Sequence, residues 1–177
     1  MIKDLTVRPK PQNNNAKIAF TVSLAVSAIG FAAYYAIERF RGIVGMLALF
    51  ALVTAILFYT KFISPIFYYD VTSDSDNVPI FVVRQIIGKR QTTLCRIDLA
   101  SITEIKKETK AEMRAHKTPS AYRKYVYAPT LFPPVVYRIT VVGRYEKSEI
   151  IIECNEDFAE YLRGCAQEAA EAVSEEE

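Results

Sequence analysis

Two long runs without a charged side chain, residues 18–37 and 42–60, constrain this chain more than any other feature. All 22 basic and 20 acidic residues lie outside them, although 51% hydrophobic and 24% charged residues is an ordinary average for a soluble protein. The runs are 20 and 19 residues long. A helix of about 20 residues, rising about 1.5 Å per residue, crosses a hydrocarbon core about 30 Å thick. We therefore expect two membrane-spanning helices, which excludes a single soluble globule, a disordered chain and a disulfide scaffold.

The two runs also predict how the helices pack. A cleaved signal peptide has a shorter apolar stretch, and a buried core helix is rarely apolar on all sides over this length. Only residues 38–41 separate the runs, so the helices are expected to form a tight antiparallel hairpin. Small residues favour close packing of helices in lipid. The hairpin contains two such series, Ala25, Ala28, Ala32 and Ala36 in the first run and Ala48, Ala51 and Ala55 in the second.

The orientation of the hairpin follows from the charges at its ends. Four basic residues precede the first run, whereas only Arg39 and Arg41 are basic in the connecting loop. The positive-inside rule then predicts a multi-pass protein of the cell membrane with both termini in the cytoplasm. The three cysteines are an odd number without close spacing, as expected for free thiols in a reducing compartment.

The rest of the chain predicts an α+β domain. Apolar, β-branched segments at 66–72, 78–87, 92–97, 102–105, 135–142 and 148–154 predict short antiparallel strands, joined by turns at Gly88-Lys89 and at 143–147. Asn155 is a favourable N-cap for a terminal helix. Its apolar face is expected to comprise Phe158, Leu162, Cys165 and Ala169. The expected fold is a two-helix transmembrane hairpin followed by a small antiparallel β-barrel or bent sheet, closed by a C-terminal α-helix.

The expected domain boundaries follow from these segments. They are a flexible N-terminal arm at 1–16, the hairpin at 17–62, a cytoplasmic domain at 63–173 and an acidic tail at 174–177. The arm is rich in Pro, Gln and Asn, which favour flexible segments.

This order of segments resembles the bacterial pleckstrin-homology-like membrane proteins, including the YcxB-like group. The residues that carry the likeness are Phe67-Tyr68-Tyr69-Asp70-Val71-Thr72, Ile87-Gly88-Lys89-Arg90-Gln91-Thr92-Thr93-Leu94 and Ile97-Asp98-Leu99-Ala100-Ser101-Ile102-Thr103. The likeness covers residues 60–177 and the arrangement of the two spans. It implies a pleckstrin-homology-like (PH-like) domain that acts as a binding or scaffolding module.

A basic segment at 106–124 is the candidate binding site. Its two acidic residues are outnumbered by seven basic ones: Lys106, Lys107, Lys110, Arg114, Lys117, Arg123 and Lys124. We interpret it as a basic loop attracted to anionic lipid, where each cation near the surface contributes about 1 kcal/mol. Two alternatives remain open: the loop is simply solvated, or it is neutralised by the acidic helix, since residues 153–177 contain nine acidic residues and one basic residue. The proline-rich segment 125–137 either clasps a partner or packs on the barrel.

Catalytic machinery is not evident in the sequence. The single histidine, His116, has no nearby cysteine or paired carboxylate in the sequence and is expected to be exposed. No metal-ligand spacing or glycine-rich phosphate loop is present. Basic residues alternate with tyrosines in the segment 122–127, but the domain lacks the dominant basic charge of nucleic-acid-binding proteins.

The sequence therefore predicts a non-enzymatic, membrane-anchored binding or scaffold protein without cofactor, metal or nucleic acid. Its expected partners are the lipid bilayer and either anionic headgroups or other membrane proteins, and its oligomeric state is left open. The first alternative is an accessory subunit of a larger membrane complex, assembled through its transmembrane helices. The second is a membrane-tethered enzyme.

Overall fold

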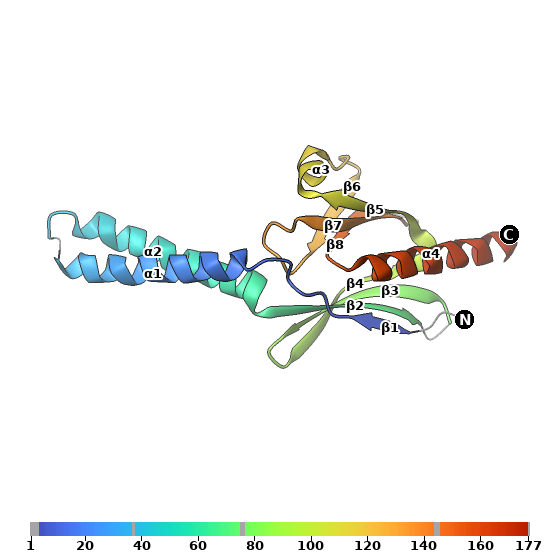
Figure 1. The fold of residues 1–177 in the computed structure, drawn as a ribbon, viewed down its shortest axis with the longest axis horizontal. Coiled ribbons are helices and arrows are strands. Elements are labelled where there is room, and N and C mark those ends of the chain that lie inside the picture. The colour runs from blue at the N-terminus through green and yellow to red at the C-terminus, as the bar shows by residue number, and fades with distance from the viewer. Residues whose placement is uncertain (1–3, 37, 75–76, 144–145, 177) are drawn as a thin grey trace. The chain divides into compact units, whose positions relative to one another are not determined.

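The computed structural model describes residues 4–36, 38–74, 77–143 and 146–176 (Figure 1). These residues form two compact units. One unit is the continuous segment 13–65. The other combines the N-terminal residues up to Gln12 with the segment that begins at Ile66. Each unit is described by itself.

The unit at 13–65 is a helical hairpin. Helix α1 spans Asn15–Ala36, and α2 spans Arg41–Phe58 and continues as a single π-helical turn, η1, over Tyr59–Ile63. Both helices are long and apolar enough to cross a membrane by length and composition. The expected helical hairpin is thus confirmed.

The two helices pack through small residues, but only partly through the expected ones. Ala48 and Ala55 of α2 are almost fully buried, as is Ser27 of α1. At Gly30 of α1, an added Cβ would lie 2.8 Å from the Cβ of Ala48, so the backbones approach closely there. The alanines expected to line this face of α1 are instead exposed: Ala25, Ala28, Ala32 and Ala36. Ser27 and Gly30 are three residues apart and share a helix face, and the alanine series lies on a different one.

We expect Gly30→Leu to destabilise the hairpin, because its side chain must displace α2. Overpacking of this kind typically costs about 1–3 kcal/mol. Gly42→Leu is the matched control, since nothing lies within 4 Å of a Cβ added at Gly42. Thermal unfolding of the full chain in detergent micelles, followed by circular dichroism, measures both. Equal midpoints for the two variants would contradict the close approach at Gly30.

The second unit contains two four-stranded sheets and three helical segments, which confirms the α+β class. The first sheet has the order β1-β2-β3-β4. Its strands are β1 Leu5–Val7, β2 Pro65–Ser73, β3 Pro79–Ile87 and β4 Arg90–Asp98. The second sheet has the order β5-β7-β8-β6. Its strands are β5 Ile102–Thr109, β6 Tyr122–Tyr127, β7 Val135–Val142 and β8 Lys147–Ile152. The helical segments are η2 Leu99–Ser101, α3 Lys110–Ala115 and α4 Glu156–Glu176.

The arrangement of the strands differs from the expected barrel. Within the ranges that the structure describes, the strands form two separate sheets and no closed barrel. In addition, β6 pairs in parallel with β8, whereas the expected strands were all antiparallel. The parallel pairing arises because β7 intervenes in sequence and pairs antiparallel with β8 on its other side.

The N-terminal segment belongs to the domain. Where the sequence predicts a flexible arm, residues 5–7 form β1 and pair antiparallel with β2, placing Leu5 opposite Val71 and Val7 opposite Tyr69. The hydroxyl of Thr6 donates to Asp70 at 2.6 Å. The hairpin is therefore inserted between two paired strands of the domain. If its two helices cross a membrane, β1 and β2 lie on the same side of it.

Helix α4 supplies much of the core of the domain. Its residues Phe158, Leu162, Cys165 and Ala169 are all buried, which confirms the expected apolar face. They pack with side chains of both sheets, and Figure 1 shows α4 lying between the two sheets. The ring centroid of Phe158 is 6.3 Å from that of Tyr69 in β2 and 6.4 Å from that of Phe81 in β3. The terminal helix thus fills the space between the sheets.

Candidate functional site

The seven basic residues of the candidate site do not form a loop. Lys106 and Lys107 lie in β5, Lys110 and Arg114 lie in α3, and Arg123 and Lys124 lie in β6. Only Lys117 lies in a connecting segment. Helix α3 begins after Thr109 because Thr109 and Glu112 form a capping box. Each side chain accepts a hydrogen bond from the backbone N–H of the other residue.

Acidic neighbours neutralise some of these cations. The ammonium group of Lys107 lies 2.8 Å from the carboxylate of Glu156, at the start of α4. The guanidinium of Arg123 lies 3.3 Å from Glu146. Neutralisation by the acidic helix, which the sequence left open, therefore applies to Lys107, the one of the seven that forms a salt bridge with a described residue of α4.

The remaining cations are exposed to solvent. The ammonium of Lys110 lies 5.7 Å from the ring centroid of Phe132, a cation–π distance. Among the described residues, no carboxylate pairs with the other four, which are Lys106, Arg114, Lys117 and Lys124. Lys106 and Lys124 share the outer face of the second sheet, since they pair in register with Arg138 and Glu149 through β7 and β8. A set of exposed cations that form no salt bridge with a described carboxylate is thus available to an anionic partner.

A buried ionic network lies on the same face of the sheet. Arg138 of β7 is 3% exposed, and its guanidinium donates two hydrogen bonds, of 2.9 and 2.7 Å, to the carboxylate of Glu108 in β5. It also donates to Glu149 of β8. Both carboxylates are buried. The arginine therefore joins three strands across the sheet.

His116 belongs to this network, contrary to the exposed position that its sequence context predicts. Its Nε2 lies 2.9 Å from Glu149, and the hydroxyl of Thr118 donates to the same carboxylate at 2.7 Å. Glu149 is 33 residues away in the chain, so the sequence offered no local signal for this pair. The sequence did contain one indirect signal, which is the charged residue Arg138 at the centre of the otherwise apolar strand β7. A charge buried in such a strand requires an ionic partner.

The network keeps its carboxylates ionised. The hydrogen bonds from Arg138 lower the pKa of Glu108 below its ordinary value of 4.5. Burial opposes ionisation of Glu149, but its bonds to Thr118 and His116 and the charge of Arg138 outweigh it and lower its pKa as well. The arrangement is that of a structural ion network, and it anchors the segment 116–118 to the sheet.

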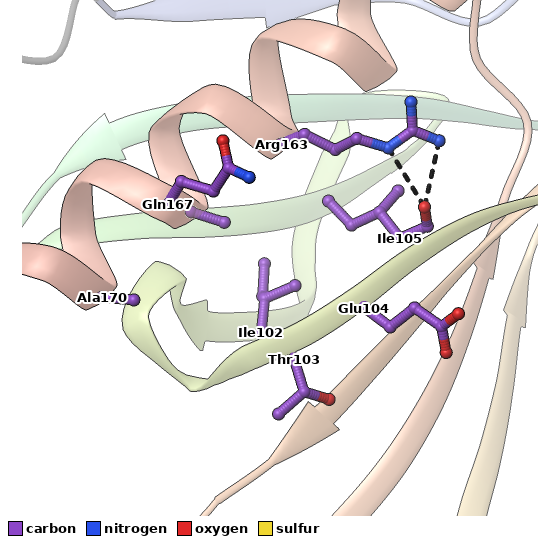
Figure 2. Close-up of a pocket in the computed structure, with 8 residues that line it drawn as sticks. Ile102, Thr103, Glu104, Ile105, Arg163, Gln167 and Ala170 are labelled. Atoms are coloured by element: carbon purple, nitrogen blue, oxygen red, sulfur yellow. Dashed lines mark hydrogen bonds between the residues drawn. The ribbon is translucent and has the colours of Figure 1, made fainter.

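Surface cavities lie on the described part of the domain. Figure 2 shows one of about 300 Å³ between α4 and β5, where Arg163 donates two hydrogen bonds, of 3.1 and 3.0 Å, to the carbonyl of Ile105. β5 is an edge strand, so its unpaired carbonyls can accept hydrogen bonds from a further strand. Arg163 satisfies the carbonyl of Ile105 instead. A wider cleft of about 570 Å³ lies between the edge strands β4 and β6. Another, of about 350 Å³, lies beside residues 7–12.

The cysteines are not activated for chemistry. Burial raises the pKa of Cys95, in the wider cleft, to about 11 and that of Cys154, beside the N-terminal segment, to about 12. A thiol is reactive as the thiolate, so both are poor nucleophiles at neutral pH. Throughout the part of the chain that the structure describes, no group of three or more His, Cys, Asp or Glu residues is placed to hold a metal ion.

Comparison with known proteins identifies no family or relative for this chain. No protein-family model, curated protein or solved structure matches this chain.

Proposed function

We propose that this chain is a non-enzymatic, membrane-anchored binding module whose PH-like domain recognises anionic lipid or an acidic partner. The observation that carries the proposal is the set of four exposed cations that form no salt bridge with any described carboxylate, Lys106, Arg114, Lys117 and Lys124. Two of them, Lys106 and Lys124, lie on the sheet face that also holds the buried network of Arg138, Glu108 and Glu149. An anionic surface that approaches this face meets exposed cations that form no salt bridge with a described carboxylate.

The hairpin supplies the anchor in this proposal. Each of its two helices contains an apolar stretch long enough to cross a membrane, and the strands on either side of the hairpin pair within one domain. The excess of basic residues before the first helix favours the cytoplasmic side for that domain. The order of strands followed by one terminal helix supports the PH-like type that the sequence resembles.

The test neutralises the unpaired cations in the full chain. The variant combines Lys106→Gln, Arg114→Gln, Lys117→Gln and Lys124→Gln, and the matched control combines Lys107→Gln with Arg123→Gln, which removes only paired cations. Both are held in phosphatidylcholine nanodiscs, and their binding to phosphatidylglycerol vesicles is measured by co-sedimentation at low salt. At about 1 kcal/mol per cation, the four changes are expected to weaken binding by up to about 4 kcal/mol, or about a thousandfold.

The control variant is expected to bind nearly as well as the unaltered chain. Polyglutamate that displaces the vesicles would indicate an acidic protein partner, and polyglutamate without effect would indicate lipid. Failure of the unaltered chain to bind either anion at low salt would reject the proposal.

One observation favours the alternative of an accessory subunit. The alanines of α1 at positions 28, 32 and 36 recur every four residues and are exposed, because the hairpin packs through a different face. Close approach of another membrane helix requires small residues at this spacing. Detergent extraction followed by mass measurement distinguishes a monomeric binding module from such a subunit.

A further inference from the structure

The chain leaves the domain and returns to it at the same end of the first sheet. Val7, the last residue of β1, pairs with Tyr69 in the middle of β2, and because the two strands are antiparallel the chain leaves β1 toward the end at which β2 begins. Only residues 8–14 separate β1 from α1, and β2 begins two residues after η1 ends. We call this the helix-proximal end of the domain. Both chain connections between the domain and the helical hairpin therefore leave from this end.

The tip of the β3–β4 hairpin lies at the helix-proximal end. Only residues 74–78 connect the neighbouring strands β2 and β3, which is too short for a parallel crossover, so the two run antiparallel. Arg84 of β3 donates to Asp70 of β2, which places the turn at Gly88 level with the first residues of β2. Ile87 at this tip is 46% exposed. The next residues, Lys89 and Arg90, are exposed and basic.

A second tip, the loop 128–134, lies at the same end. Gln12 holds it there: its side-chain amide donates to the carbonyl of Val135 at 3.0 Å, and its backbone N–H donates to the hydroxyl of Thr130 at 2.8 Å. Only two residues separate Gln12 from the start of α1, and a chain spans at most about 3.6 Å per residue. This loop is therefore also tethered to the helices.

Phe132 is the apolar residue of the second tip. It is 60% exposed, and its φ of +57° lies in the left-handed region, which bulky residues rarely adopt. Its ring lies beside the ammonium of Lys110. Such strain at an exposed aromatic residue is typical of positions that the fold holds for contact with a partner.

We propose that these two tips insert into the headgroup layer of the bilayer that holds α1 and α2, with anionic lipid as the partner. Ile87 and Phe132 enter the boundary of the acyl chains, while Lys89, Arg90 and Lys110 contact lipid phosphates. Apolar side chains flanked by cations are the composition that binds this layer. The inference rests on the membrane anchoring proposed above, but it assigns a second surface, distinct from the four unpaired cations.

The chain contains no tryptophan, so single tryptophans report the depth of chosen positions. Ile87→Trp and Phe132→Trp probe the tips. Val78→Trp is the negative control, because Val78 is exposed at the opposite end of the first sheet, and Leu49→Trp is the positive control within α2. Each full-length variant is reconstituted in vesicles of phosphatidylcholine and phosphatidylglycerol whose acyl chains carry bromine, which quenches tryptophan on contact.

We expect Ile87→Trp and Phe132→Trp to lose emission relative to unbrominated vesicles, as Leu49→Trp does, while Val78→Trp keeps its emission. Quenching at Leu49 with none at either tip would overturn this inference and leave the membrane anchor intact. An unquenched Leu49→Trp would overturn the anchor itself, and with it this inference. The two tips are tested by separate variants. If one of the two tryptophan variants fails to fold, the other still tests the inference.

Discussion

Arg138→Ala is expected to lower the free energy of unfolding of the domain by about 3–5 kcal/mol, the loss typical when one member of a buried ion pair is removed. The reason is that Glu108 and Glu149 stay buried while their shared cation is gone. Urea unfolding of the full chain in micelles, followed by tyrosine fluorescence, measures the loss. Arg123→Ala is the matched control: its guanidinium also lies beside a carboxylate, but the pair is exposed to solvent, so a far smaller loss than that of Arg138→Ala is expected.

The pH dependence of this variant identifies the cause of its loss. The pKa values of Glu108 and Glu149 are lowered in the folded protein, so their contribution to stability is present above about pH 4.5 and is lost as the pH falls below it. In Arg138→Ala both carboxylates lose their cation and accept protons more readily. The deficit should therefore be largest above pH 4.5 and shrink below it. A deficit that does not change with pH would indicate lost packing instead.

Glu153→Ala is expected to destabilise the domain by about 2–4 kcal/mol, because the two donors of Thr130 lose their acceptor and the backbone N–H of Gln12 keeps only the hydroxyl of Thr130. Its buried carboxylate accepts from the backbone N–H of Gln12 at 3.0 Å, from the backbone N–H of Thr130 at 3.1 Å and from the hydroxyl of Thr130. Hydrogen exchange should therefore accelerate at the amides of Gln12 and Thr130. Glu153→Gln is the control, because its amide oxygen remains an acceptor and should preserve part of that protection.

Glu153 also carries a pH dependence of the opposite sign to that of Glu108. Burial raises its pKa above 4.5 despite the three hydrogen bonds. Its contribution to stability is therefore fully present below pH 4.5 and declines as the pH rises through the raised value. Glu153→Gln should remove this part of the pH profile. A profile that is unchanged in Glu153→Gln would show that the dependence arises elsewhere.

Segments with a strong local pattern could be predicted from the sequence. The uncharged runs became α1 and α2, and β7 has the expected bounds of 135–142 because its apolar residues are bounded by prolines and a glycine. The apolar spacing after Asn155 identified the buried face of α4. In each case the residues that determine the element are neighbours in sequence.

Features that depend on partners distant in sequence could not be predicted. β1 is only three residues long and exists because β2, some 60 residues later, pairs with it. Two of the six residues of β6 are charged, so its sequence has no clear strand pattern, and the segment forms a strand because it pairs with β8. One missed element did have a local signal: Thr109 and Glu112 have the spacing of a capping box, which marks the start of α3.

The placement of the hairpin between β1 and β2 has a consequence for biosynthesis. β1 leaves the ribosome before either helix, and its partner β2 follows both, so the first sheet can close only after both helices have been synthesised. A chain that inserted one helix alone would leave β1 and β2 on opposite faces of the bilayer, with the edge of β2 uncovered. Unpaired edges aggregate and expose backbone to proteases. If the helices cross a membrane, completion of the first sheet therefore requires that both of them have inserted.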